Sequence, residues 1–405
     1  MKRTAAALLL ALAAACAHRA KPGGASLSPA APAAAPLPPA PPAQPAPPSG
    51  LRPDAALPPA PPPAAALAPP ARATPITVAA VGDVMLGSSF PDETGGLLPS
   101  DDGKGLLVEV TPLLAAADVA FANLEGPLLD QGRSEKCAAS RAGHCFAFRV
   151  PTRYGRLLQA AGVDVVSLAN NHAGDFGDAG RTSTRSTLDA LGIRYAGAPG
   201  EVARLEVHGA RVALVAFATS SGLNDLRDLA EAARIVADAK RGADLVIVSM
   251  HGGAEGADRQ HVPPGREAFL GEDRGDLRRF ARTVVDAGAD LVIGHGPHVV
   301  RGMEILKGRL VAYSLGNFAT YGGMNLSGPN GLTLVLEARL APDGTFLGGR
   351  IHPGRQERPG GPKLDAAGAV IPVVRRLSQE DFGPSAVRIA DDGTLSPPAP
   401  IAATR

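Results

Sequence analysis

The sequence lacks an excess of charge of either sign. Its 405 residues include 40 Lys and Arg against 39 Asp and Glu, which gives a formal net charge of +1. A dedicated nucleic-acid-binding protein usually carries a strongly basic surface, so this balance argues against one. Charged residues make up 20% and hydrophobic residues 45% of the chain, proportions that are ordinary for a globular protein.

Long apolar runs are also missing. None reaches the roughly 18 residues that a helix needs to cross a bilayer, so a polytopic membrane protein is not expected. Three cysteines are too few for a disulfide scaffold. The chain has no G-x-x-x-x-G-K-[ST] phosphate loop, no G-x-S-x-G nucleophile turn and no C-x-x-C pair. These absences exclude three common kinds of active site.

The first 16 residues have the pattern of an export signal. Lys2 and Arg3 precede a short apolar stretch, and small residues precede Cys16. A cysteine in this position resembles the bacterial lipobox, in which that cysteine is lipidated. We therefore expect an exported, periplasmic lipoprotein anchored to a membrane through Cys16. The alternative is a simple signal peptide that is cleaved near Ala15.

Composition divides the rest of the chain. Residues 17–75 contain 20 Pro and 20 Ala, with almost no large apolar side chain, which predicts a disordered, extended tether. The remainder is long enough for one large domain, expected at 76–320, with a β-rich extension at 321–390 that completes it. A loose Pro/Ala-rich tail is expected at 391–405.

The globular part alternates short apolar strands with helical stretches, an order that indicates a layered α/β fold. Strands are expected at 76–82, 119–125, 163–170, 212–218, 244–250, 290–295 and 310–318. Most lack strict polar alternation, which is typical of strands buried on both faces. Helices are expected at 106–117, 152–161, 179–191, 224–240 and 273–287. After residue 330 we expect strands alone, including AVIPVVRRL at 369–377.

Polar residues stand where these strands end. In open α/β sheets, ligands bind outside the carboxyl ends of the strands, so such residues should gather at one edge. They are Asp83, Asn123, Glu125, Asn170, Asn171, His172, His251, His295, His298 and Asn317. Carboxylate, amide and imidazole together suit Mn²⁺, Fe, Zn²⁺ or Mg²⁺, and one or two such ions can activate a water molecule. A single such residue is usually structural, but six strand ends together predict a shared metal site.

The blocks around these residues are AAVGDVMLG, ANLEGPL, SLANNHAGDFG, VSMHGGAE, GADLVIGHGPHVVRG and AYSLGNF. In this order they resemble the bacterial CapA, or poly-γ-glutamate capsule biosynthesis, family over roughly residues 76–320. That family is similar to calcineurin-like metallophosphoesterases. The resemblance implies an α/β sandwich of two β-sheets flanked by helices, with a divalent metal site.

The resemblance also implies roles for individual residues. The expected metal ligands are Asp83, Glu125, Asn171, His251, His295 and His298. His172 is expected beside the metal as a proton donor, with Asp175 as its catalytic partner. The phosphoesterase pattern has a histidine two residues after its first aspartate, whereas this chain has Met85. The terminal histidines, His295 and His298, are three residues apart instead of two.

The two remaining cysteines, Cys137 and Cys145, lie close together in the sequence. Because an export signal implies an oxidising compartment, we expect them to form a disulfide. A metal site that uses His144 is the alternative.

Two functions follow from these patterns. The first is a metal-dependent hydrolase or transferase of the cell envelope, acting on a phosphoester or on an anionic polymer such as poly-γ-glutamate. The second is a non-catalytic envelope protein that holds such a polymer. Five arginines near the motifs could steer an anionic polymer or simply lie on a solvated face: Arg149, Arg153, Arg181, Arg185 and Arg301.

Overall fold

The computed structural model describes residues 74–91, 97–134, 136 and 146–398. The expected export signal, the lipidation site Cys16 and the Pro/Ala-rich tether lie outside these residues. So do both partners of the expected disulfide, Cys137 and Cys145. No helix within the described residues is long and apolar enough to cross a membrane.

The larger sheet is built around β1 (Ile76–Met85), which pairs in parallel with β2 (Val119–Leu124). β3 (Val165–Ser167) and β4 (Arg194–Ala196) continue this parallel half. On the other side of β1 the strands run antiparallel: β14 (Leu332–Leu340), β15 (Phe346–Gln356), β18 (Thr394–Ser396) and β17 (Arg388–Ile389). Two short strands pair at its edges, β13 (Asn317–Thr320) with β1 and β16 (Pro362–Leu364) with β15.

The second sheet has the order β11-β12-β10-β7-β6-β5. Its strands are β5 (Ala203–Val207), β6 (Ala210–Ala218), β7 (Leu245–His251), β10 (Leu291–His295), β11 (Met303–Leu306) and β12 (Arg309–Ala312). The four central strands, β6, β7, β10 and β12, are parallel. Their carboxyl ends therefore meet at one edge, as they do in the parallel half of the first sheet.

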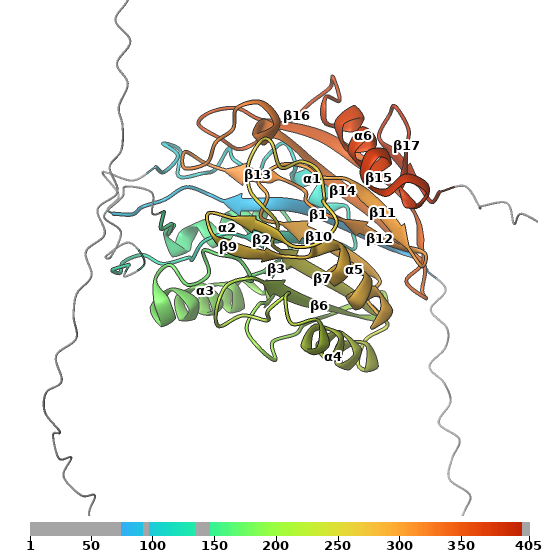
Figure 1. Ribbon diagram of the computed structural model, residues 1–405. Helices are drawn as coiled ribbons and strands as arrows, with labels where there is room; N and C mark the ends of the chain where they lie inside the picture. The colour runs from blue at the N-terminus through green and yellow to red at the C-terminus, as the bar shows by residue number, and fades with distance from the viewer. Residues whose placement is uncertain (1–73, 92–96, 135, 137–145, 399–405) are drawn as a thin grey trace, which may run out of the picture. The chain divides into compact units, whose positions relative to one another are not determined.

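Helices cover the outer faces of both sheets (Figure 1). The first sheet carries α1 (Thr111–Ala115), α2 (Gly155–Ala160) and α3 (Gly177–Leu191). The second carries α4 (Leu229–Arg241) and α5 (Leu277–Asp286). Short 3₁₀ turns lie at Thr152–Tyr154, Gly328–Gly331 and Gly383–Ser385. The predicted α/β fold of two sheets flanked by helices is confirmed.

The buried side chains explain this layering. On β1, Val78 and Ala80 face the second sheet, whereas Ala79 and Val81 face the helices. The strands of the second sheet alternate in the same way between the inner core and the core under α4 and α5. Strands that bury both faces need apolar residues at nearly every position, which is why the sequence shows apolar runs there.

The prediction of strands alone after residue 330 is wrong at one place. Residues 369–377, expected as a strand, belong to α6 (Val370–Phe382). Its buried side chains include Val370, Ile371, Val374 and Leu377, which recur at helical spacing, and Pro372 lies in the first turn, where its missing N–H costs no hydrogen bond. The expected loose tail also begins later than residue 391, because β18 pairs with β15.

The strand expected at 310–318 is two strands in two different sheets. The segment between them, residues 313–316, crosses from β12 to β13 and lies against both β1 and β10. A Cβ on Gly82 would lie 2.0 Å from the Gly316 carbonyl oxygen, and one on Gly294 would lie 2.0 Å from the Tyr313 carbonyl oxygen. Only glycine permits these backbone contacts. They bring the two sheets together immediately before Asp83 and His295.

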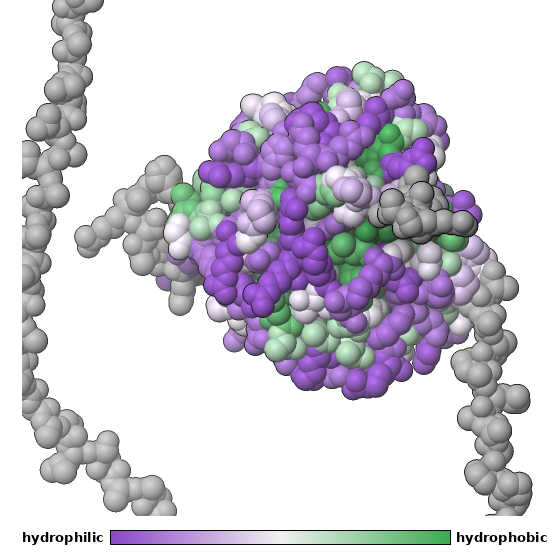
Figure 2. All heavy atoms as spheres, turned by 45° about the vertical axis from the view of Figure 1, so that its right-hand side comes forward, coloured by the Kyte–Doolittle hydropathy of each residue, from purple (hydrophilic) through white to green (hydrophobic). Residues whose placement is uncertain are grey.

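A small hairpin, β8 (Glu267–Phe269) and β9 (Glu272–Gly275), stands apart from both sheets. A buried ion pair fixes its base, since both guanidinium nitrogens of Arg301 donate to the Glu267 carboxylate at 2.8 Å. The rest of the surface is ordinary for this composition. Figure 2 shows a mainly hydrophilic face on which hydrophobic side chains form smaller groups.

Candidate metal centre

Both sheets deliver polar side chains to one place. Asp83 stands at the end of β1, in register with Asn123 of β2 and Asn317 of β13. His251 and His295 stand opposite each other at the ends of β7 and β10. All five side chains are completely buried. The predicted convergence at the carboxyl edge follows from the parallel strands and the crossing segment between the sheets.

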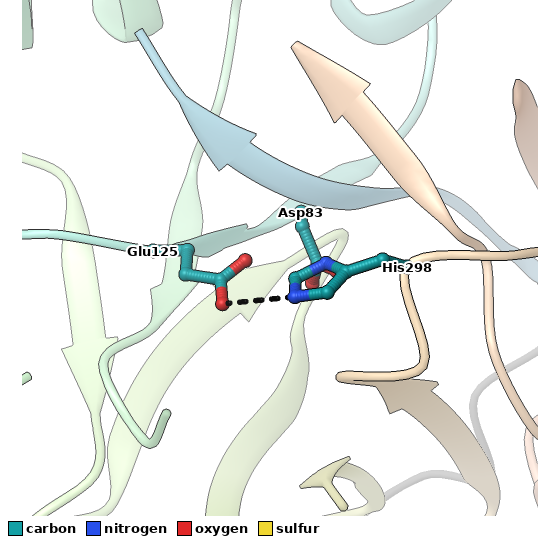
Figure 3. Close-up of side chains that lie close together, drawn as sticks. All are labelled: Asp83, Glu125 and His298. Carbon is teal, nitrogen blue, oxygen red and sulfur yellow. Dashed lines mark hydrogen bonds and ion pairs between the residues drawn. The ribbon is translucent and has the colours of Figure 1, made fainter. Parts of the chain in front are cut away.

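Asp83, Glu125 and His298 form the tightest group. One potential ligand atom from each lies within 4.8 Å of the others. His298 Nδ1 lies 3.0 Å from Asp83 Oδ2, and His298 Nε2 lies 3.9 Å from Glu125 Oε1. Figure 3 shows the Glu125 carboxylate and the His298 ring pointing toward each other, with Asp83 behind the ring.

The backbone of His298 is held in an uncommon conformation. Its φ of +58° lies in the left-handed region, which few residues other than glycine adopt. Its carbonyl oxygen accepts hydrogen bonds from the side-chain amides of Asn317 and Asn330, at 3.3 and 3.1 Å. These bonds hold the loop that places His298 beside Asp83.

The other expected ligands surround this group without bonding to it. His251 Nε2 lies 3.8 Å from Glu125 Oε1, and His295 Nδ1 lies 3.6 Å from Asp83 Oδ1. Both distances are too long for hydrogen bonds. Among the described residues, several buried atoms of the predicted ligands have no hydrogen-bond partner: both Glu125 carboxylate oxygens, Asn171 Oδ1, His251 Nε2 and both His295 ring nitrogens.

Such orphaned atoms are unusual, because a buried polar atom without a partner costs about 1–3 kcal/mol. Here they come from several separate segments and gather around the same small volume. Carboxylate, amide oxygen and imidazole are also the donors that divalent transition metals bind. Two ligands of one ion, each about 2.0–2.2 Å from it, lie about 3–4 Å apart, close to the spacings found here. Asp83, Glu125 and His298 therefore fit a divalent cation, with His251 and His295 beside them and Asn171 in the lining of the same cleft as His298.

The pKa values of Glu125, Asp83 and His298 also indicate a place for a cation. Burial raises the pKa of Glu125 well above its usual value, and the nearby Asp83 carboxylate raises it further. Burial also acts to raise the pKa of Asp83, but the hydrogen bond and positive charge of His298 hold it well below the usual value. Burial opposes the charge on His298, yet Glu125 and Asp83 together raise its pKa to about 10. Without a metal, protonated His298 supplies the positive charge beside the two carboxylates. A bound cation would take over that role and release the His298 proton, because the neutral imidazole is the form that binds metals.

His251 and His295 have the opposite tendency. Burial holds the pKa of His251 well below its usual value and lowers that of His295 to about 4. Both rings are therefore neutral near pH 7, and the neutral imidazole is the form that binds metals.

Two asparagines that the sequence places at strand ends, without assigning them a role, hold the ligands in place. Asn123 Nδ2 donates to Asp83 Oδ1 at 2.8 Å. Asn170 Nδ2 donates to the Leu124 carbonyl at 2.8 Å, and Asn170 Oδ1 accepts from the backbone N–H of His172. These amides connect β1, β2 and the loop after β3. Their position in NLE and ANNH was the only available signal.

The expected catalytic pair is also assembled. His172 Nδ1 lies 2.7 Å from Asp175 Oδ2, and both side chains are buried. Burial lowers the pKa of His172, although the Asp175 carboxylate opposes that shift. Lys136 Nζ approaches Asp175 Oδ1 at 2.5 Å and donates to the Asn171 carbonyl. Lys136 was not expected at the site, because no strand end or motif marks it.

A second pair borders His298, and it joins Glu255 of the VSMHGGAE block to Arg274, which the sequence did not mark. Arg274 Nη2 lies 2.9 Å from Glu255 Oε1, and Glu255 Oε2 lies 3.9 Å from His298 Nε2. Arg274 is buried and also donates to the Gly253 carbonyl, which ties the hairpin to the loop after β7. The pair therefore adds a carboxylate to the outer side of the group.

Met85 stands at the position where the phosphoesterase pattern has a histidine ligand. It is buried at the end of β1, and its Sδ-methyl lies close to Gly323.

Two of the arginines considered for polymer steering are also buried. Arg149 donates to the Gly132 carbonyl, and Arg301 pairs with Glu267, so neither steering nor a solvated face describes these two.

The centre opens into a cleft of about 380 Å³. Its polar lining includes His172, His298, Asn171 and Glu255, and its apolar lining consists of Phe146, Phe148, Phe269, Leu270 and Met324. That volume is within the range of small-molecule sites. Lys136 and Arg274 also line the cleft.

Known proteins show similarity to this chain. The 5'-nucleotidase precursor from Thermus thermophilus superposes with a TM-score of 0.39 at 14% identity, covering 69% of this chain and 54% of that one. The capsule biosynthesis protein CapA of Bacillus anthracis is 28% identical over 264 residues, 60% of this chain and 59% of that protein. The PGA biosynthesis protein CapA of Bacillus subtilis (strain 168) is 28% identical over 255 residues, 59% of this chain and 61% of that protein.

The matches thus span about three fifths of the length of these two relatives. Residues 77–321 match the family described as bacterial capsule synthesis protein PGA_cap, and this range contains every predicted ligand and both members of the His172–Asp175 pair. Because the match covers more than half of the sequence, the chain belongs to the PGA_cap family of bacterial capsule synthesis proteins.

Proposed function

We propose that this protein is a divalent-metal-dependent hydrolase or transferase of the cell envelope that acts in the synthesis of a capsular, poly-γ-glutamate-type polymer. The observation that carries the proposal is the set of buried donor atoms without partners. A merely structural cluster would satisfy these atoms with hydrogen bonds, whereas a metal-dependent site has a use for them.

The proposed ligands are Asp83, Glu125, Asn171, His251, His295 and His298. A cation bound by them would polarise an oxygen of the scissile group and lower the pKa of a bound water molecule. Asn123 and Asn170 hold Asp83 and the His172 loop in position. The protein's own contribution is thus an arrangement fixed before the substrate binds.

His172 is the group placed to move a proton. Its Nδ1 faces Asp175, which orients the ring and leaves Nε2 as the atom that exchanges a proton with the reacting group. The ring lines the cleft beside His298. We assign His172 the proton transfer at the leaving group, with Asp175 as its partner and Lys136 holding Asp175.

Family membership supports the substrate class. The names of the two Bacillus relatives refer to capsule and PGA biosynthesis. An anionic polymer or phosphoester would bring its negative charge to a centre that holds a cation. The expected export signal and lipid anchor would place the reaction at the outer face of a membrane.

A non-catalytic role in holding such a polymer is the second candidate. The side chain of Met85 stands where the phosphoesterase pattern supplies a ligand, and it offers no oxygen or nitrogen. A centre with fewer ligands can still anchor an anion through a bound cation while lacking the geometry for turnover.

The first experiment separates these two functions. We would load the full-length protein with Mn²⁺, measure bound metal by elemental analysis, and assay a nitrophenyl phosphodiester and a γ-glutamyl anilide. His172→Ala should keep metal content near wild type and lower turnover by about 10²–10⁴-fold. His352→Ala is the matched control, since His352 pairs with Glu337 on β14 and β15 away from the centre. Full activity of His172→Ala contradicts the catalytic role, and a wild type that binds metal without turnover supports the holding role.

A further inference from the structure

The mouth of the cleft carries exposed apolar side chains beside the exposed polar residues Lys136, Glu272 and Asn325. Among the described residues, Leu270 is 87% exposed and Phe146 is 59% exposed, and both line the cleft. Phe269 and Met324 lie in the same lining. Exposed apolar groups are common singly, but a group from three separate segments around one opening indicates a binding surface.

The aromatic side chains form a row that leads to His172. The Phe148 ring centroid lies 4.5 Å from that of His172, and the Phe146 ring is stacked on Phe148 at 6.3 Å with 26° between the planes. The row therefore runs from the residue assigned to proton transfer out to an exposed ring. A flat apolar group bound at the leaving-group side would extend this row.

Leu270 occupies a position that suits leucine poorly. It stands at the turn of the β8–β9 hairpin with φ +49°, next to Gly271 with φ +83°. Turns of this kind favour glycine, asparagine or aspartate, which tolerate the left-handed region and are polar. A leucine here is disfavoured both by its backbone conformation and by its exposure to water, so its side chain must serve another purpose.

The hairpin also presents Leu270 rigidly. The Arg301–Glu267 ion pair fixes its first strand, and Arg274 fixes its second strand to Gly253. A rigidly held apolar side chain binds a ligand with a smaller loss of conformational entropy than a mobile one. The cleft is thus lined by a firmly held apolar side chain in addition to the aromatic row.

We propose that the substrate is a phosphoester whose leaving group is apolar, an aromatic or branched aliphatic group that lies between Phe146 and Leu270. This inference rests on the proposed function and narrows its substrate class. The phosphate faces the metal ligands, and the apolar group lies at the mouth. Hydrolysis breaks the bond from phosphorus to the leaving oxygen and forms one to the water oxygen. One water proton goes to the leaving oxygen through His172, and the other leaves with phosphate or solvent.

Binding of non-hydrolysable probes tests this directly. Phenylphosphonate and methylphosphonate share an anionic head and differ in the apolar group. Isothermal titration of the full-length, Mn²⁺-loaded protein should give phenylphosphonate an affinity about tenfold higher. Phe146→Ser should reduce that ratio about three- to tenfold and leave the methylphosphonate affinity unchanged. Leu347→Ser is the control, because Leu347 is 45% exposed on β15, near the end of the sheet opposite the centre.

Leu270→Asn separates a binding role of Leu270 from a structural one. Asparagine suits the turn, so thermal stability should be equal or higher, while the preference for phenylphosphonate should fall about three- to tenfold. A purely structural role for Leu270 predicts the reverse, a loss of stability with unchanged preference. That result, or a wild type that binds both probes equally, would overturn the proposal.

Two further arms keep this inference distinct from the proposed function. Turnover of phenyl and methyl phosphodiesters without discrimination would leave the function standing and reject the apolar leaving group. A phenyl preference in binding without any turnover would leave the apolar subsite standing and reject the hydrolytic function, and with it the assignment of the apolar group as a leaving group. Sedimentation with phosphatidylglycerol vesicles tests whether the apolar mouth contacts a bilayer. Vesicle binding that Leu270→Asn abolishes, with no phenyl preference in wild type, would overturn the proposal in favour of a lipid surface.

Discussion

The protein contains two buried charged clusters, one around Arg301 and one around Glu125, and they differ in one respect. Each guanidinium nitrogen of Arg301 has a partner. The two terminal nitrogens donate to the Glu267 carboxylate, Nε donates to the Arg259 carbonyl, and Nη2 also donates to the Ala254 carbonyl. Around Glu125, both of its own carboxylate oxygens, His251 Nε2 and both His295 ring nitrogens have no partner among the described residues. The first cluster is complete within the protein, whereas the second leaves donor atoms that a ligand could bind.

Breaking the complete cluster should have the largest effect. Arg301→Ala leaves the Glu267 carboxylate buried without a counter-charge, and we expect the free energy of unfolding to fall by about 3–5 kcal/mol. Urea denaturation measures this. The control is Arg153→Ala, because the Arg153–Asp102 pair is about half exposed and should contribute less than about 1 kcal/mol. A loss below about 1 kcal/mol for Arg301→Ala would show that its pairing is not structural.

Breaking the incomplete cluster should affect metal binding more than folding. His251→Ala removes a proposed ligand, so Mn²⁺ affinity should fall at least about 10–100-fold, while the unfolding free energy without metal changes little. Titration with Mn²⁺ and the metal-dependent rise in melting temperature report the effect. His352→Ala should leave both unchanged. Equal metal affinity in His251→Ala and wild type would remove His251 from the ligand set.

The smallest expected effect is a gain in the free energy of unfolding. Glu125 is a buried carboxylate beside Asp83, so in the metal-free protein Glu125→Gln removes a repulsion and should raise the unfolding free energy by about 1 kcal/mol. The same change should weaken the stabilisation by Mn²⁺. Glu337→Gln, at a carboxylate bonded to His352, serves as the comparison in EDTA. If Glu125→Gln destabilises the metal-free protein, Glu125 is satisfied there and the contrast between the clusters fails.

The sequence predicted the layers of the fold because strands buried on both faces leave apolar runs that alternate with helices. It failed at α6, where Val370, Ile371 and Val374 have high strand propensity. Their helical spacing decides the structure, because it presents one apolar face to the sheets. The crossing of residues 313–316 between the sheets was hidden as well, since the glycines that permit it, Gly82 and Gly294, lie on strands distant in the sequence.

At the site, the strand ends indicated the proposed ligands and the supporting Asn123 and Asn170, but not the other residues that border them. Asp83 and His295 lie at the carboxyl ends of β1 and β10, and the segment that crosses between the two sheets brings them together. Lys136 and Arg274 have no such marker, because each reaches the site only through a carboxylate that is distant in the sequence, Asp175 for Lys136 and Glu255 for Arg274. Arg301 was misjudged because a sequence does not show that Glu267, on a separate hairpin, would bury it.

Gly82 and Gly294 have a consequence for how this protein can change. Both glycines contact the crossing segment through backbone atoms alone. The distance of 3.6 Å between His295 Nδ1 and Asp83 Oδ1 therefore depends on the width of one polypeptide strand packed between β1 and β10. A methyl group at either position would displace a whole sheet rather than one side chain. Directed evolution of new specificities should therefore accept substitutions at the mouth of the cleft and reject them at these two glycines.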